Sequence, residues 1–426
     1  MQYGAPETIL VDGAPHLGTD NLVRLLRNMR NDLRNLGGEV RFGAKMTDLV
    51  IEDGIAKGVH VKFSEAVERS KDGSASTPTY SENETIICDA VVLATGHSAR
   101  DVYEILHKTG VQIEAKGFAV GFRVEHPQKL INKVQYGNEW GPSVVTGKSV
   151  TDVANQDYFN SMEHDPDKSH PGRLPVSSYR LATDKAYDGK KYRGVYSFCM
   201  CPGGQIVPSS TDTGQLCVNG MSFSKRDSVW ANSALVVTVS PEDEILEKYR
   251  AKYGVLAGIE FQKDMERRAY ELGGGNLTVP VQRLTDFVEG RPSTSAPPSS
   301  YRLGVKPAAC HEIYPEPLVN ALRDAVVNNF AKQMPGFLCD NALLHAVETR
   351  TSSPVRVSRD AKTLQAVGTE RLFPAGEGAG FAGGIVSAAV DGMVVAEAVL
   401  KKVSVHGSDG SSSQWKRTTN SVGYNY

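Results

Sequence analysis

The sequence predicts an α/β fold in which a β-rich α+β domain is inserted into a domain built on a parallel sheet. Ile86 to Ala94 is a nearly continuous apolar segment of strand length, as is typical of parallel strands buried on both faces. Arg371 to Leu400 shows a short strand, a glycine-dense turn and a helix. The stretch between them is rich in strand-like segments, and 426 residues predict two or three domains.

The first part of the chain predicts one helix and a small antiparallel meander. Thr19 or Asp20 is placed to cap a helix whose apolar residues recur three and four apart, and Gly37 is placed to end it. Ser64 to Thr85 is polar without periodicity and is interpreted as a surface insertion. The predicted strands of the meander, with a hairpin turn at Glu52-Asp53-Gly54, are Glu39 to Phe42, Thr47 to Glu52 and Ile55 to Phe63.

The pattern changes at about Gly117, and we expect the inserted domain to begin there. Arg291 to Ser300, rich in proline and serine, is interpreted as a loop. The predicted domains are therefore 1–116 with 336–403, an inserted substrate domain at 117–335, and a disordered tail at 404–426. The predicted strands and helices of the insert are Phe118 to Val124, Tyr192 to Met200, Gln215 to Gly220, Ala234 to Val239, Leu256 to Leu272 and Leu318 to Met334.

Composition narrows the function classes. A formal net charge of −2 leaves no basic field to attract nucleic-acid phosphates, and no apolar segment approaches the ~20 residues that span a bilayer. The six cysteines are scattered, which indicates a reducing compartment, and the Cys199-x-Cys201 pair lacks the further ligands of a metal site. The first residues show no signal or transit character and resemble the inside of a domain. We expect a protein of the cytoplasm or the plastid stroma without a metal.

The most informative segment is the glycine-dense turn before the last predicted helix. Gly378, Gly380 and Gly383 satisfy G-x-G-x-x-G, and the following helix N-terminus offers unpaired amides and a positive dipole end to an anion. Glu377, directly after Gly376, can accept hydrogen bonds from sugar hydroxyls. A purely structural turn is the alternative. A nicotinamide-only fingerprint requires a second strand with an acidic end after the helix, whereas a polar tail follows here.

Two segments resemble motifs of two-domain FAD-binding flavoproteins. Pro374-Ala375-Gly376-Glu377 is similar to the strand end Ala-x-Gly-(Asp or Glu), whose following helix points at the pyrophosphate and flavin. Asp89 to Gly96 is similar to the strand ending in Ala-Thr-Gly that passes beneath the adenine side. The resemblance implies that FAD contacts these residues: Thr95, Gly96, Gly376, Glu377, Gly378, Gly380, Gly383 and Gly384.

Longer motifs widen this resemblance to about Gly4 to Val403. The chain resembles the uncharacterised FAD-dependent dehydrogenase family of bacteria and plastid-bearing eukaryotes, which implies a Rossmann-like FAD/NAD(P)-binding domain. Members normally begin with a βαβ unit carrying a G-x-G-x-x-G for FAD, which is absent here. We therefore expect an incomplete domain that binds FAD weakly or not at all, or folds poorly. The motifs are Pro15 to Asp20, Gly96 to Asp101, Phe118 to Pro127, Cys199 to Gly204 and Glu348 to Pro354.

The resemblance implies an FAD-dependent oxidoreductase of an organic substrate, with NAD(P)H open as a second redox partner; the alternative is a non-catalytic binding remnant. Arg350 is a candidate to bind a substrate carboxylate or stabilise charge at the flavin, and equally a candidate for an ion pair with Glu348 or another acid. Cys201 is a candidate redox residue in a loop over the flavin, or a small packed side chain. His97 is expected to cap a helix near Ala99, and neither His16 nor His126 is expected to act as a base.

Overall fold

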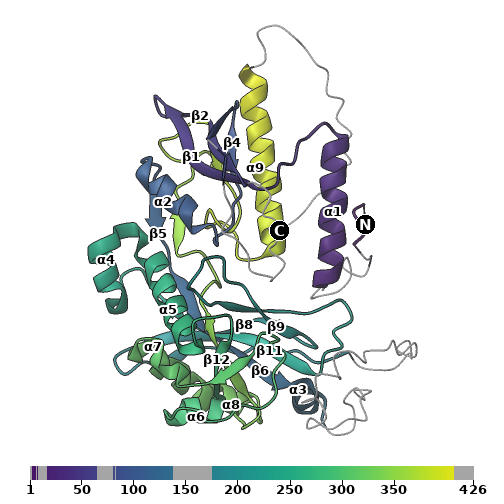
Figure 1. Ribbon diagram of the computed structural model, residues 1–426, viewed down its shortest axis with the longest axis vertical. Helices are drawn as coiled ribbons and strands as arrows, with labels where there is room; N and C mark the ends of the chain where they lie inside the picture. Colours follow the sequence, from purple (N-terminus) through teal and green to yellow (C-terminus); the bar gives the residue numbers. More distant parts are fainter. Residues whose placement is uncertain are drawn as a thin grey trace. The chain divides into compact units, whose positions relative to one another are not determined.

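The structure is a computed structural model that describes residues 2–5, 7, 17–64, 80–81, 83–137 and 175–406 (Figure 1). The chain divides into two compact units, one formed by 1–42 with 115–355 and one by 43–114 with 356–426. Most of the expected insertion Ser64 to Thr85, the motif residues Pro15 and His16, and 407–426 of the expected tail lie outside the described residues.

The first unit is built on a seven-stranded sheet in the order β13-β12-β14-β6-β11-β8-β7. The central strands β6 and β11 are antiparallel, with Phe118 opposite Val239 and Pro127 opposite Trp230, and nearly every residue in them is buried. A two-stranded ribbon of β9 and β10 completes the unit. The bounds are β6 Phe118–Pro127, β7 Ala182–Tyr187, β8 Tyr192–Cys201, β9 Gln205–Pro208, β10 Val218–Met221, β11 Trp230–Val239, β12 Val279–Arg283, β13 Val305–Pro307 and β14 Leu343–Glu348.

Aromatic contacts join this sheet to a helix and to a neighbouring loop. The ring of Phe122, on β6, meets Phe287 and Tyr314 edge-on at centroid distances of 5.4 and 5.2 Å. Gly274, with φ +110°, ends α5 in the left-handed conformation typical of helix C-termini. The helices are α1 Thr19–Asn35, α3 Gln128–Tyr136, α4 Glu247–Tyr253, α5 Ala257–Gly273, α6 Leu284–Glu289, α7 Glu316–Asp324 and α8 Ala331–Gln333, with a π-helical turn Ala325–Phe330 and 3₁₀ turns Glu244–Leu246, Gly254–Leu256 and Cys310–Glu312.

The second unit combines an antiparallel meander with a short parallel pair. β1 and β2 meet at Asp53 and Gly54, both with positive φ, which confirms the predicted hairpin turn. β4 pairs in parallel with β16, and Leu49, Leu106 and Leu372 lie in the small core beneath. The elements are β1 Ala44–Glu52, β2 Ile55–Phe63, β3 Glu84–Ile87, β4 Val91–Leu93, α2 Arg100–Lys108, β16 Leu372–Pro374 and α9 Ile385–His406; β5 Ile113–Ala115 pairs with β15 Val355–Val357 where the chain passes between the units.

Four expectations differ from the structure. Ile86 to Ala94 is not one strand, because β3 pairs antiparallel with β2 and the chain then enters the parallel pair as β4. Glu39 to Phe42 forms no strand. The expected helix Leu318 to Met334 begins at Glu316 and is interrupted by the π-helical turn Ala325–Phe330.

The fourth difference is the division of the chain. β14 lies inside the seven-stranded sheet, so 336–355 fall with the inserted region rather than with the parallel strands. α1 is grouped with the same unit: Thr19 N donates to Ser222 O at 3.1 Å, and Asp20 accepts from the amide of Ser224 at 2.8 Å instead of capping its own helix. Among the described residues, no helix combines the length and apolar character needed to cross a membrane.

Candidate cofactor site

The candidate site lies at the carboxyl ends of the parallel strands β4 and β16. Leu93 is opposite Pro374, and the amide of Ala375 donates to Leu93 O at 2.9 Å, so both strands end at the same level. Thr95 is exposed just beyond β4, and Gly96 turns the chain with φ +71°. Ligands of open α/β sheets bind at such carboxyl edges.

The two sequence motifs meet in a backbone contact at this edge. A Cβ added to Gly378 would lie 2.6 Å from both the carbonyl carbon and the oxygen of Gly96, so only glycine allows the two turns to approach this closely. The hydroxyl of Tyr103, on α2, donates to Gly378 O at 2.7 Å and is buried. The Ala-Thr-Gly turn and the glycine-dense turn therefore form one surface.

Glu377 presents its carboxylate beside His97. Oε1 of Glu377 lies 3.4 Å from Nδ1 of His97, and the two side chains are 21% and 17% exposed. The expectation that His97 caps the following helix is wrong: the N-cap is Ala99 without a side-chain cap, and the carboxylate of Asp101 accepts from the amide of Val102 at 3.1 Å. Glu377 remains partly accessible to a hydroxyl-bearing ligand.

The glycines that precede α9 leave open space. A Cβ at Gly383 or at Gly384 would meet no atom within 4 Å. The Ser387 hydroxyl donates to Gly384 O at 3.0 Å and accepts from the amide of Gly383 at 3.3 Å, while Ala388 N bonds Gly384 O as the helix begins. A bulky anion can therefore approach this backbone. The first amides of a helix have no acceptor within the helix, so they suit a diphosphate. These residues fit the phosphate and sugar groups of FAD.

Arg350 belongs to the unit formed by 1–42 with 115–355, and it forms an ion pair with Glu266. Its Nε and Nη2 bond both oxygens of Glu266 at 3.1 and 2.9 Å, and Nη1 donates to Thr211 Oγ1 at 2.7 Å. Burial acts to lower the pKa of Arg350, but the hydrogen bonds and charge of Glu266 outweigh it and leave that pKa raised. The ion-pair interpretation is the one that this geometry favours, with Glu266 rather than Glu348 as the partner.

Cys201 is buried beside a guanidinium that the sequence analysis did not single out. Arg123 is fully buried on β6; its Nη1 contacts both carboxylate oxygens of Glu348 at 3.0 Å, and its Nη2 donates to Cys201 Sγ at 3.3 Å. Burial raises the pKa of the Cys201 thiol, so little reactive thiolate forms at neutral pH. The sequence signal for this residue is a cation within the otherwise apolar strand segment Phe118 to Val124, because a charge in a buried strand needs a partner.

A second buried polar group lies on the same sheet. Glu125 accepts from the amide of Ser300 at 3.1 Å and from its hydroxyl, and burial raises the pKa of Glu125 to about 7. His345 Nε2 lies 2.7 Å from Ser299 Oγ, and burial lowers its pKa to about 4. His126, not expected to act as a base, is also fully buried. Within the described ranges, no three His, Cys, Asp or Glu side chains are grouped as metal ligands.

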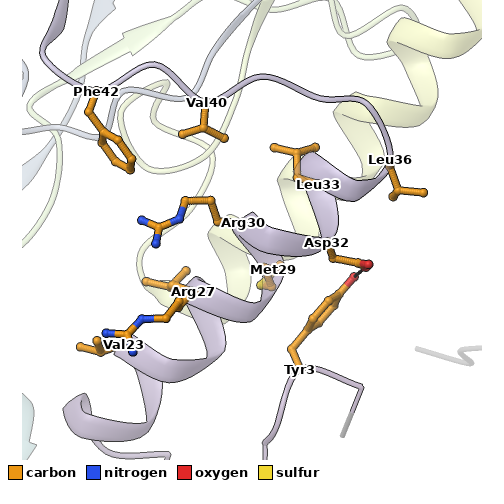
Figure 2. A pocket seen from close by; sticks show the side chains of 11 residues that line it. Tyr3, Val23, Arg27, Met29, Arg30, Asp32, Leu33, Leu36, Val40 and Phe42 are labelled. Carbon is orange, nitrogen blue, oxygen red and sulfur yellow. Dashed lines mark hydrogen bonds between the residues drawn. The ribbon is translucent and has the colours of Figure 1, made fainter.

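A groove of about 710 Å³ follows helix α1 (Figure 2). Its wall is the apolar face of the helix, where Leu26 is 61% and Leu33 49% exposed. Tyr3 donates to Asp32 at 3.0 Å at one side, and the guanidinium of Arg30 lies 5.3 Å from the ring centroid of Phe42. The helix thus has the predicted amphipathic pattern, yet none of its residues is fully buried.

Comparison with known proteins gives one family match and one similar protein. Residues 153–351 match the family described as FAD-dependent protein, C-terminal domain-like. An uncharacterised protein of Clostridium beijerinckii is 40% identical over 405 residues, which cover 94% of this chain and 64% of that protein. The chain thus spans just under two thirds of this relative's length. The matched range contains neither Gly96 nor Gly378, so it supports an FAD-dependent family independently of the geometry at the strand ends.

Proposed function

We propose that this chain forms part of an FAD-dependent oxidoreductase and that the carboxyl edge of β4 and β16 holds the cofactor. The observation that carries the proposal is the contact of Gly378 with Gly96, which joins two FAD-like motifs into one surface. The match of 153–351 to an FAD-dependent family supports it from a different part of the chain. The substrate is proposed to be a small organic molecule bound by the region 117–335.

Each part of the edge has a proposed role in binding. The amides at the start of α9 and the open backbone of Gly383 and Gly384 would hold the diphosphate, because both donors and space are present. The carboxylate of Glu377 would accept hydrogen bonds from ribityl or ribose hydroxyls, and Thr95 with Gly96 would line the adenine side. FAD, when bound, supplies the two-electron chemistry, and the protein orients substrate and cofactor.

We further propose that an additional βαβ unit completes this site. Within the described chain, β4 has β16 as its only neighbour in a sheet of two strands, whereas sheets usually have more strands and parallel sheets are covered on both faces. Val92 on β4 is 46% exposed, and α9 exposes Val386 at 74% and Met393 at 69%. A strand beside β4 and a helix over this apolar surface would bury it. The extra length of the Clostridium relative leaves room for such a unit.

The test uses alanine substitutions that separate folding from cofactor binding. Gly383→Ala adds a methyl group where the diphosphate is proposed to approach, in space that is open in the protein itself. Gly392→Ala, on helix α9, which begins just after Gly383, is also in open space and is the matched control. We expect Gly383→Ala to weaken FAD binding at least tenfold, measured by quenching of flavin fluorescence, and Gly392→Ala to leave it unchanged. Both proteins should unfold at or slightly above the parent's midpoint, because alanine restricts the unfolded chain.

A non-catalytic binding module is the competing function. The engagement of Arg350 by Glu266 and of Cys201 by Arg123 favours it, since neither side chain is available for chemistry. The absorption spectrum between 350 and 500 nm separates the two, recorded for this chain and for the protein made from its full coding sequence. Flavin bands that bleach on adding NAD(P)H would support the oxidoreductase and a nicotinamide partner. Absence of flavin from both proteins would exclude the FAD-dependent oxidoreductase.

A further inference from the structure

One guanidinium ties together the segments around the glycine-dense turn. Arg359 has a side chain only 9% exposed and makes a two-pronged contact with Asp391 on α9, Nη2 to Oδ1 at 2.9 Å and Nη1 to Oδ2 at 3.1 Å. Nη1 also donates to the carbonyl of Pro374, the last residue of β16, at 2.9 Å. A planar guanidinium suits such a fixed two-pronged geometry. The end of the strand and the body of the helix are thereby joined.

Asp391 extends this connection to the turn itself. Its Oδ2 also accepts a hydrogen bond from the amide of Gly376 at 2.7 Å, so one carboxylate binds both Arg359 and the residue before Glu377. Gly376 has φ +73°, a conformation that glycine adopts without strain. Burial acts to raise the pKa of Asp391, but the hydrogen bonds from Arg359 and Gly376 outweigh it and hold that pKa below its usual range.

Phe381 closes the other end of the turn on the same side chain. The Arg359 guanidinium carbon lies 3.7 Å from the centroid of the Phe381 ring, within the range of cation–π attraction. The amide of Phe381 bonds the carbonyl of Gly376 at 3.1 Å, and Gly380 N bonds Glu377 O at 3.0 Å. The turn is therefore fixed at its beginning through Asp391 and at its end through the aromatic ring, with Arg359 common to both.

We propose that Arg359 and Asp391 are positioning residues for the cofactor site. Their ion pair sets the direction in which the Gly376–Phe381 turn and the start of α9 face, and so presents Glu377 and the open backbone of Gly383 to the cofactor. This inference rests on the proposed function, because it concerns how the same edge is held in its binding geometry. Arg359 and Asp391 themselves make no contact with FAD in this proposal.

The position of this pair distinguishes it from a second ion pair, which α9 makes near its far end. Lys402 contacts Glu370 at 3.2 Å near the far end of the helix, and its partner carboxylate is 62% exposed. Exposed pairs of that kind contribute little to stability. The Asp391 carboxylate is 13% exposed, and each of its described hydrogen bonds is made to Arg359 or to the turn. Lys402 therefore offers a control on the same helix.

The experiment measures FAD affinity with the protein made from its full coding sequence and freed of flavin. The variants are Asp391→Asn, which keeps the shape but removes the charge, Arg359→Lys, which keeps the charge but removes the two-pronged contact, and Lys402→Gln as the control. Flavin fluorescence quenching gives the dissociation constant, at a temperature well below the lowest unfolding midpoint of the variants. Visible circular dichroism at saturating FAD reports how the bound ring is oriented. Unfolding midpoints are recorded without flavin.

We expect Asp391→Asn and Arg359→Lys to raise the dissociation constant at least tenfold and to change the dichroism of the bound flavin, with Lys402→Gln like the parent. Lower unfolding midpoints with unchanged affinity and dichroism would mean that the pair only stabilises the fold, which overturns the inference. If Asp391→Asn does not fold, Arg359→Lys decides by the same criteria. Failure of the parent protein to bind FAD would overturn the proposed function itself, and that result is visible without any variant.

Discussion

Gly378→Ala tests whether the two glycine turns pack as the structure shows. The new Cβ would lie 2.6 Å from the backbone of Gly96, where contacts of about 3.4 Å or more are normal. Because the neighbour is backbone, one turn must move by roughly 1 Å, at a cost of about 1–3 kcal/mol for overpacking. The buried hydrogen bond from Tyr103 to the carbonyl of Gly378 would be strained as well, which adds about 1 kcal/mol.

The expected loss of about 2–4 kcal/mol lowers the unfolding midpoint by roughly 5–15 °C for a domain of this size. Thermal unfolding followed by circular dichroism measures it, and flavin titration of the folded variant should show weaker binding. Gly392→Ala, which meets no atom within 4 Å in the same unit, should instead gain up to about 1 kcal/mol of helix stability. If Gly378→Ala unfolds at the same temperature as the parent, the backbone contact between the motifs does not exist.

Three further predictions concern the other unit. Arg350→Met should cost about 3–5 kcal/mol in urea unfolding, because it leaves Glu266 buried without its cation, and a substrate-binding role alone predicts no such loss. Glu125→Gln should remove a pH dependence of the stability. Folding raises the pKa of this carboxyl from 4.5 to about 7, so its contribution to the free energy of unfolding is complete at low pH and is lost as pH rises through this window. The effect is opposite in sign to that of His345, which is neutral in the folded protein and reduces its stability as pH falls below 6.5. An unchanged stability profile in Glu125→Gln would contradict this assignment. Leu33→Lys should change the free energy of urea unfolding by less than about 0.5 kcal/mol, because that side chain is 49% exposed in an apolar groove.

Local patterns predicted the elements whose signals are local. Helix α1 extends over Thr19–Asn35 and is closed at Gly37 with φ +88°, as the spacing of its leucines and the glycine indicated. The hairpin at Asp53-Gly54 and the helix after the glycine-dense turn are confirmed for the same reason. The division of Ile86 to Ala94 between two sheets could not be predicted, because it depends on which strands lie beside β3 and β4 rather than on the apolar character of the segment.

The candidate site shows the same distinction between local and long-range signals. The glycines of the two turns stand out in the sequence because a tight turn or a close backbone approach restricts the residue type, but the contact that joins Gly378 to Gly96 appears only in three dimensions. Arg350 and Cys201 were selected by residue type, and their partners Glu266 and Arg123 are 84 and 78 residues away in sequence. Long-range partners of this kind decide whether a polar side chain is available for chemistry.

The arrangement of charged side chains suggests different roles for the two units. The unit formed by 1–42 with 115–355 buries two ion pairs inside it, Arg123 with Glu348 and Arg350 with Glu266, where each guanidinium is matched by an acid. Buried pairs of this kind are costly to desolvate and hold one packing arrangement once formed. The parallel-strand unit also contains a largely buried pair, Arg359 with Asp391, but it keeps Glu377 partly accessible next to open glycine backbone. Recognition of a polar cofactor requires accessible acceptors and amides, so the binding chemistry is expected at this edge, while the buried pairs of the other unit maintain its sheet.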